Sequence, residues 1–139
     1  MPPALKTSKT SAAGSKRGAV AIEYAIILPV LLLFVLGVMD IGRLLWTYTT
    51  LARASEAAAR CYAIQATGCT TVSGVQSYAA GQAWGLTVAS SVFAVTTQTC
   101  GAQVVATYVF QFVIPWLGPA PPFGTSNSIT LTTTACYPA

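Results

Sequence analysis

The sequence predicts an α+β protein: a long N-terminal transmembrane and amphipathic helix followed by a small head with a short helix and a three-stranded antiparallel β-sheet. The chain of 139 residues is 54% hydrophobic and only 7% charged, whereas an average soluble domain carries roughly 25% charge. A long apolar run follows a basic amino terminus, as in membrane-anchored proteins. The last third alternates apolar and Thr-rich positions, which is typical of strands.

Residues 1–18 form a small, polar and basic leader that we expect to be flexible and cytoplasmic. It holds four of the seven Lys and Arg residues. The remainder of the chain has three arginines and three acids, so its net side-chain charge is zero. Because a phosphate-binding surface needs clustered Lys and Arg, nucleic acid is not an expected partner.

The chemical inventory argues against an enzyme. The chain contains no histidine and only three carboxylates, and none of these follows Arg60. Histidine is the commonest general base and the commonest metal ligand. We therefore expect no catalytic residue, no metal site and no cofactor.

Residues 19–42 are predicted to be a transmembrane helix. The run from Ala19 to Met39 carries a single charge, Glu23, and as a helix it would extend about 32 Å. The basic leader predicts a cytoplasmic N-terminus and an exported head. A removable secretory signal is the rival interpretation, but the sequence around Asp40 lacks a small-x-small cleavage site.

Glu23 needs an explanation, because a carboxylate in the middle of a membrane helix costs on the order of 3 kcal/mol on insertion scales. One interpretation places Glu23 near the cytoplasmic interface, where it pairs with Lys16 or Arg17. The other starts from the order of the residues: a basic pair, Gly18, and then an apolar helix with Glu at its fifth position and Tyr24 after it.

This order resembles the cleavage site of prepilins of the type IV filament superfamily, and the Glu-Tyr pair resembles the Flp subclass of tight-adherence (Tad) systems. The resemblance implies cleavage after Gly18 by a prepilin peptidase, which leaves Ala19 as the new N-terminus. It also implies that Glu23 neutralises the N-terminal ammonium of an adjacent subunit, which would relieve the cost of burying both charges.

Residues 18–64 look like the TadE-like family of minor pseudopilins. The resemblance rests on Pro29 in the apolar run, on the acidic-x-Gly-Arg pattern of Asp40 and Arg43, and on the alanine-rich helix that closes on Ala-Ala-Arg. It implies a subunit of the inner membrane whose partners are other pilins and pseudopilins through the N-terminal helix, the prepilin peptidase and the pilus platform proteins.

Residues 43–66 are predicted to extend the helix as an amphipathic segment through about Ile64. We expect its apolar side to pack against the head through four residues, which are Tyr48, Leu51, Ala58 and Tyr62. Two charge pairs, Asp40 with Arg43 and Glu56 with Arg60, are expected to be exposed, each worth roughly 0.2 to 0.5 kcal/mol. Alternatively, Asp40 contacts a neighbouring subunit or the platform.

Residues 67–139 are predicted to form the exported head. A short helix starts at Val72 or Val75 and runs to Trp84, and Gly85 is placed to stop it. Three β-rich segments follow at 86–97, 102–114 and 128–137. We expect them to form an antiparallel meander that gains stability by packing against the helix.

The four cysteines indicate two disulfides rather than a zinc site, because their intervals of 8, 31 and 36 residues lack paired Cys-x2-Cys spacing. Three pairings are possible. If the second and third strands are antiparallel neighbours, Cys136 lies near Cys100, and Cys61 then pairs with Cys69. The missing Cys-x-x-Cys motif also argues against a disulfide oxidoreductase.

Together these observations lead us to expect a non-enzymatic minor pseudopilin that is processed after Gly18 and is needed for assembly or function of a Flp-type pilus. It would lie in the inner membrane as a single-pass protein, or within the extracellular pilus. The alternative is a permanently anchored cell-envelope protein whose head binds a ligand or surface and never enters a filament.

Overall fold

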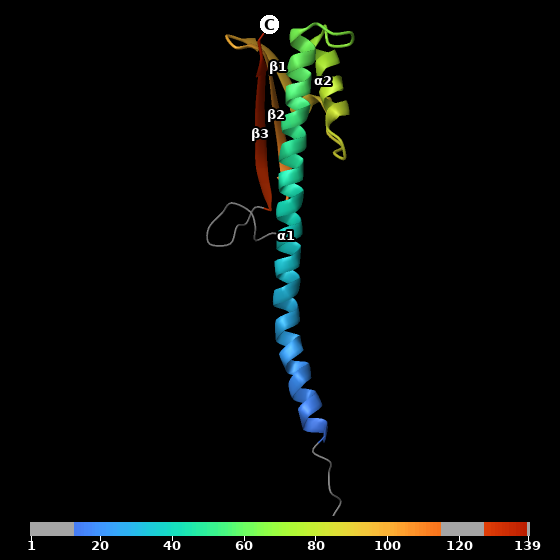
Figure 1. Ribbon diagram of the computed structural model, residues 1–139, viewed down its shortest axis with the longest axis vertical. Helices are drawn as coiled ribbons and strands as arrows, with labels where there is room; N and C mark the ends of the chain where they lie inside the picture. Colours follow the sequence, from blue (N-terminus) through green and yellow to red (C-terminus); the bar gives the residue numbers. More distant parts are fainter. Residues whose placement is uncertain (1–12, 115–126, 139) are drawn as a thin grey trace, which may run out of the picture. The chain divides into compact units, whose positions relative to one another are not determined.

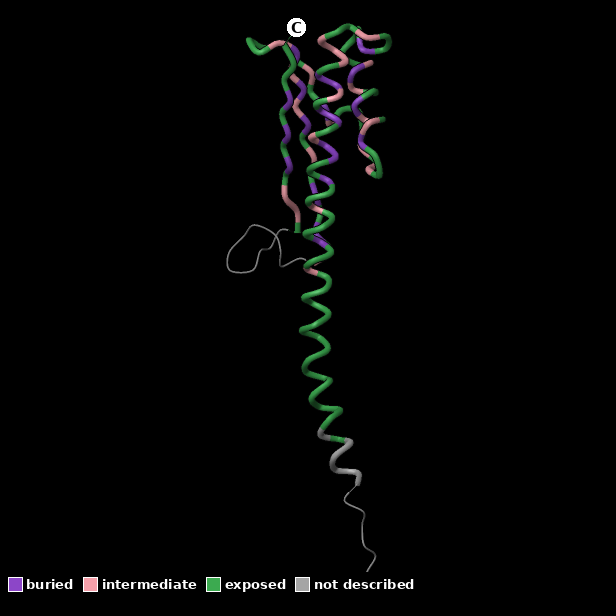
Figure 2. Tube along the Cα trace, in the orientation of Figure 1, coloured by how far each residue is buried: buried purple, intermediate pink, exposed green. Residues whose placement is uncertain are grey.

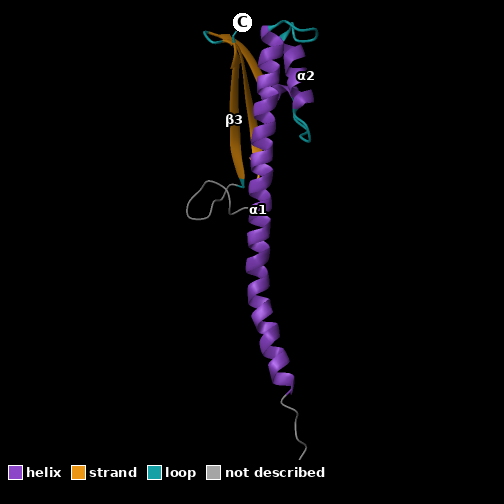
Figure 3. Ribbon diagram, in the orientation of Figure 1, coloured by secondary structure: helices purple, strands orange, loops and turns teal. Residues whose placement is uncertain are grey.

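The computed structural model describes residues 13–114 and 127–138, and its elements confirm the predicted α+β class (Figures 1 and 3). The elements are two α-helices, a short 3-10 helix and three strands: α1 (Ala13–Ala63), α2 (Val72–Gln82), η1 (Ser90–Val92), β1 (Phe93–Gln98), β2 (Gly101–Gln111) and β3 (Ser128–Tyr137). The chain divides into two compact units, Met1–Leu36 and Gly37–Ala139, which are described separately below.

The Met1–Leu36 unit contains the first part of α1. Every described side chain from Val20 to Leu36 is exposed (Figure 2). The most apolar 18-residue window of the helix has a mean hydropathy of 2.5, and 6% of it is buried. By length and composition this helix is a possible membrane anchor, because it leaves a continuous apolar surface that needs lipid or protein around it.

The start of α1 differs from the sequence prediction. The helix begins at Ala13, whereas we expected it to begin at Ala19 after a leader without helical structure. That prediction is wrong for residues 13–18. Once a helix is nucleated, each added residue contributes a further backbone hydrogen bond, so a long helix extends into neighbouring residues that contain no proline. Pro29 lies inside α1.

The Gly37–Ala139 unit contains an antiparallel sheet with the strand order β1-β2-β3. Phe93 of β1 pairs with Ala106, and Gln111 of β2 pairs with Ser128. The predicted meander is therefore confirmed. Its first strand starts at Phe93 rather than at Leu86, because η1 precedes it; serine side chains such as Ser90 compete for backbone hydrogen bonds and favour such turns.

The core of this unit lies between α1, α2 and the inner face of the sheet (Figures 1 and 2). Leu51 and Ala58 of α1 are fully buried, as predicted, and Tyr62 is partly buried. Tyr48 is 46% exposed, so its predicted contact with the head is wrong. Small and hydroxyl-bearing residues line the buried side of α1 instead and allow its backbone to approach the sheet: Thr47, Thr50, Ala54, Ser55 and Ala59.

One polar contact crosses this core. Ser55 has no exposed surface, and its hydroxyl donates to the carbonyl of Leu51 at 2.9 Å. The same hydroxyl lies 3.2 Å from the hydroxyl of Thr133 on β3. Because a buried hydroxyl without a partner costs free energy, this pair fixes the position of β3 along α1 as well as filling space.

The short helix α2 starts at Val72, one of its two predicted starts. Thr71 caps it by accepting a hydrogen bond from the backbone N–H of Gly74 at 3.2 Å. The helix ends at Gln82, and Gly85 follows with φ of +77°, a conformation that glycine adopts readily. Gly85 thus lies in the turn that ends the helix.

Two disulfides close the head. Cys61 is bonded to Cys69 across the end of α1, and Cys100 is bonded to Cys136. The second bond joins residues beside the paired ends of β2 and β3, where Gln103 pairs with Cys136. Both bonds agree with the pairing that the antiparallel arrangement predicts.

Candidate functional site

The first candidate site is the amino-terminal motif around Glu23 in the Met1–Leu36 unit. Gly18 is exposed, and a Cβ atom added there would meet nothing within 4 Å. Ala19 follows it in α1, and its side chain lies outside the described ones. Glu23 lines a shallow groove on one face of the helix together with Val20, Tyr24 and Ile27. Among the described atoms, nothing therefore lies against the Cβ position of Gly18.

Glu23 has no charged partner among the side chains that the structure describes, where the ion pair between Arg43 and Asp40 is the only one. The alternative pairing of Glu23 with Lys16 or Arg17 falls outside those side chains. Tyr24 is 69% exposed beside it. The face that carries the Glu23-Tyr24 pair is therefore open to contacts from outside this unit.

The second candidate site is centred on Asp40, which lies in the Gly37–Ala139 unit. Asp40 is only 2% exposed. Its Oδ1 accepts a hydrogen bond from the Arg43 guanidinium at 3.0 Å. Its Oδ2 accepts two backbone hydrogen bonds, from the N–H of Val113 at 2.9 Å and from that of Ile114 at 3.0 Å.

These contacts correct two interpretations of Asp40. We predicted an exposed pair with Arg43, but only the arginine side chain, at 54% exposure, is open to solvent. The alternative contact with a neighbouring subunit finds almost no exposed surface on Asp40. Because both carboxylate oxygens accept hydrogen bonds from within the unit, Asp40 joins α1 to the chain leaving β2.

Arg43 contributes a second contact to the same place. Its guanidinium carbon lies 5.5 Å from the centre of the Phe110 ring, a cation–π geometry worth about 0.5 to 1 kcal/mol at an exposed site. The Phe110 ring meets that of Phe112 edge to face, with centroids 5.2 Å apart. We call Asp40, Arg43, Phe110 and the backbone of Val113 and Ile114 the Asp40 cluster.

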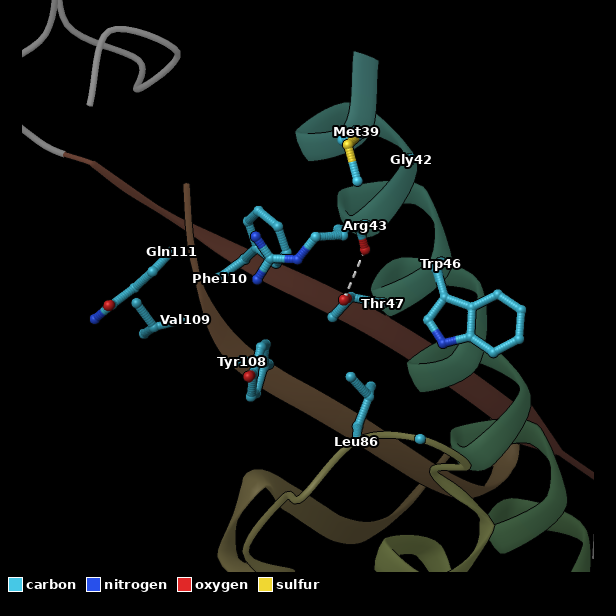
Figure 4. A pocket seen from close by; sticks show the side chains of 11 residues that line it. Met39, Gly42, Arg43, Trp46, Thr47, Leu86, Tyr108, Val109, Phe110 and Gln111 are labelled. Carbon is cyan, nitrogen blue, oxygen red and sulfur yellow. Dashed lines mark hydrogen bonds between the residues drawn. The ribbon is translucent and has the colours of Figure 1, made fainter. Parts of the chain in front are cut away.

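An open groove of about 740 Å³ adjoins the Asp40 cluster (Figure 4). Figure 4 shows Arg43 and Trp46 of α1 on one side and Tyr108 and Phe110 of β2 on the other. Leu86 closes one end. The groove thus combines one cation with aromatic, apolar and polar side chains, Thr47 and Gln111 among the polar ones.

Within residues 13–114 and 127–138, no group of three or more His, Cys, Asp or Glu side chains is placed to hold a metal ion. Sequence reasoning found Asp40 and Arg43 but missed their partners in the cluster. The two amides are backbone groups, which no side-chain pattern can reveal.

Residues 18–60 match the family model for the TadE-like protein. This segment of the chain is TadE-like. The match confirms the resemblance seen in the sequence and is consistent with a TadE-like protein of the Tad pilus system. No curated protein and no solved structure gave a match to the chain.

The TadE-like segment covers about a third of the chain and includes Gly18, Glu23, Asp40 and Arg43. It ends at Arg60, so the sheet lies beyond it. Asp40 therefore connects the TadE-like segment with the backbone of a region outside the match.

Proposed function

We propose that this chain is a minor pseudopilin that a prepilin peptidase cleaves after Gly18, and that it is needed for the assembly or function of a Flp-type pilus. The observation that carries the proposal is the fully exposed apolar part of α1 with its single acid, Glu23, in a TadE-like segment. The exposed apolar side chains of such a helix must be covered by lipid or by other helices.

Glu23 supplies the reason for a partner helix. A lone carboxylate near the bilayer centre costs on the order of 3 kcal/mol on insertion scales. Cleavage after Gly18 would create an ammonium group at Ala19, about one helical turn before Glu23 in sequence. If the ammonium of one subunit meets Glu23 of the next, both charges gain a partner of opposite sign. Cleavage and assembly are then coupled by electrostatics.

The proposed location follows from charge and cysteine use. The Lys and Arg residues gather before the apolar run, which favours a cytoplasmic N-terminus. The two disulfides lie in the Gly37–Ala139 unit, and disulfides persist in oxidising compartments. We therefore place the helix in the inner membrane and the head on its outer side, with other pilins and pseudopilins, the peptidase and the pilus platform as partners. The role is structural rather than enzymatic.

The groove beside Arg43 favours a second candidate function. A permanently anchored envelope protein would bind a ligand in the head without entering a filament, and the groove of about 740 Å³ beside Arg43 is a place where a ligand would fit. The two candidates differ in the fate of residues 1–18, which a permanent anchor keeps.

Measurement of the mature N-terminus separates them. The full chain is expressed with an active Tad-type prepilin peptidase and, separately, with a catalytically dead one, and its intact mass is determined. We expect a chain starting at Ala19 only with the active enzyme. Gly18→Leu should block cleavage, whereas Gly37→Leu, a matched change at another open glycine of α1, should not. Retention of Met1 while a reference prepilin is cut in the same cells would refute the proposal.

A further inference from the structure

The exposed apolar surface of α1 does not end at Asp40. Asp40 marks the end of the apolar run in the sequence, but its side chain is buried within the Gly37–Ala139 unit. The exposed side chains on either side of it remain large and apolar: Val38, Met39, Ile41, Leu45 and Trp46, between 49% and 62% exposed. The first charge exposed along this part of α1 is therefore Arg43, at 54%.

Exposed apolar side chains of the head gather at the same level. The loop after α2 reaches α1 there, because a Cβ atom added to Gly85 would lie 3.8 Å from the indole nitrogen of Trp46. Its neighbour Trp84 is 74% exposed. Val113, whose amide binds Asp40, is 67% exposed. Three parts of the chain thus contribute exposed apolar side chains at this level: Trp46 from α1, Trp84 from the loop after α2, and Val109 and Val113 from β2 and the residues that follow it.

The chemistry of this surface is that of a membrane interface. Tryptophan is enriched where lipid head groups meet water. In a helix, side chains lean toward the N-terminus, so Trp46 leans along α1 toward the apolar run. Arg43 uses one nitrogen for Asp40, and a guanidinium has five N–H donors suited to phosphate oxygens. Arg43 and Trp46 line the same groove, and an arginine beside a tryptophan suits a phospholipid head group.

We propose that this basal surface, made of Arg43, Trp46, Trp84, Val109 and Val113, lies in the head-group layer of the bilayer and that Arg43 binds a lipid phosphate there. The argument for lipid is that three large apolar side chains of the candidate membrane helix, Val38, Met39 and Ile41, are exposed on either side of Asp40 in this same unit, together with the complementary charges of guanidinium and phosphate. The inference rests on the membrane anchoring in the proposed function, but not on cleavage or pilus entry.

Single-tryptophan reporters test the contact with lipid. In the full chain, Trp46 and Trp116 are both changed to Phe, so that Trp84 is the single tryptophan whose fluorescence is measured. Trp116 lies outside the described residues. The matched control carries Trp only at position 64, by Ile64→Trp, an exposed site in the turn directly after α1 (61% exposed). Each chain is placed in vesicles of phosphatidylcholine and phosphatidylglycerol, with or without brominated lipid, and its association with lipid is checked by flotation.

We expect brominated lipid to quench Trp84 strongly and aqueous iodide to quench it several-fold less than the control tryptophan. A chain that floats with the vesicles but leaves Trp84 as open to iodide as the control overturns this inference and leaves anchoring intact. A chain that does not float overturns both. Shielding of Trp84 that disappears when the chain is diluted in lipid means that a protein covers the surface, which also overturns the inference.

A second arm tests the phosphate contact. The full chain is released from vesicles into mild detergent, and the phospholipid that stays bound is counted by native mass spectrometry. Arg43→Gln should lose bound phosphatidylglycerol that the wild type and Arg53→Gln retain, Arg53 being an exposed arginine outside the basal surface. Equal lipid retention by Arg43→Gln and Arg53→Gln would overturn the assignment to Arg43.

Discussion

The substitution Asp40→Asn tests how the head is held to α1. The carboxylate serves three donors, Arg43 through one oxygen and the amides of Val113 and Ile114 through the other. An asparagine has one acceptor oxygen and one amino group, so it can serve the arginine or the two amides but not both. The amino group of the asparagine then faces other donors, so the hydrogen bonds either to Arg43 or to the two backbone amides are lost.

The size of the effect follows from which bonds are lost. Hydrogen bonds to a charged group contribute about 1.5 to 3 kcal/mol each. Arg43 is half exposed, and solvent screening reduces its share. We therefore expect Asp40→Asn to lower the free energy of unfolding by about 2 to 4 kcal/mol, chiefly through the two backbone amides. For a domain of this size that lowers Tm by roughly 10 to 25 °C.

Thermal unfolding of the full chain in mild detergent, followed by near-ultraviolet circular dichroism with both disulfides intact, measures this change. Hydrogen exchange at the amides of Val113 and Ile114 locates it, since these two should lose protection first. The control is Glu56→Gln, an exposed carboxylate on the same helix, which should change stability by less than about 0.5 kcal/mol. If Asp40→Asn melts with the control and both amides stay protected, the structural role of Asp40 is wrong.

Two further predictions concern the head. Replacing Cys100 and Cys136 by Ser opens a 36-residue interval and should lower the free energy of unfolding, measured in urea, by about 4 kcal/mol on the chain-entropy model. The comparison is the loss of the disulfide between Cys61 and Cys69, which closes only 8 residues. A smaller destabilisation from the 36-residue interval than from the 8-residue one would contradict the prediction. Gly74→Ala should destabilise by about 1 to 3 kcal/mol, because its Cβ would collide with the carbonyl of Gly68. Gly81→Ala in the same helix meets nothing within 4 Å and should stabilise by up to about 1 kcal/mol; equal effects of the two glycine changes would show that local packing does not decide them.

The features that the sequence predicts well depend on periodicity or on strand register. Alternating residues and turns specify the meander, and the meander brings Cys100 to Cys136. The apolar run specifies a helix because no charge but Glu23 interrupts it. Such patterns are local, so they can be recognised without knowing the rest of the fold.

The features that the sequence does not reveal depend on distant partners. The amides that bind Asp40 are 73 and 74 residues away in sequence and belong to the backbone. A charge at the end of an apolar run therefore looks exposed although it is buried. Tyr48 was assigned to the packed side of α1 by the helical periodicity of the segment, but the helix approaches the sheet through small residues such as Ala54 and Ala58. Hydrophobicity alone does not show how closely two elements approach.

The central claim is that Glu23 needs a charged partner on another subunit. Recovery of other pilins with the tagged, processed chain from solubilised membranes tests it most directly, with cleavage after Gly18 verified by mass in each sample. The account predicts that Glu23→Gln is cleaved normally but recovers far less pilin than the wild type, while Glu56→Gln recovers the same amount. Equal recovery by cleaved Glu23→Gln would contradict the claim.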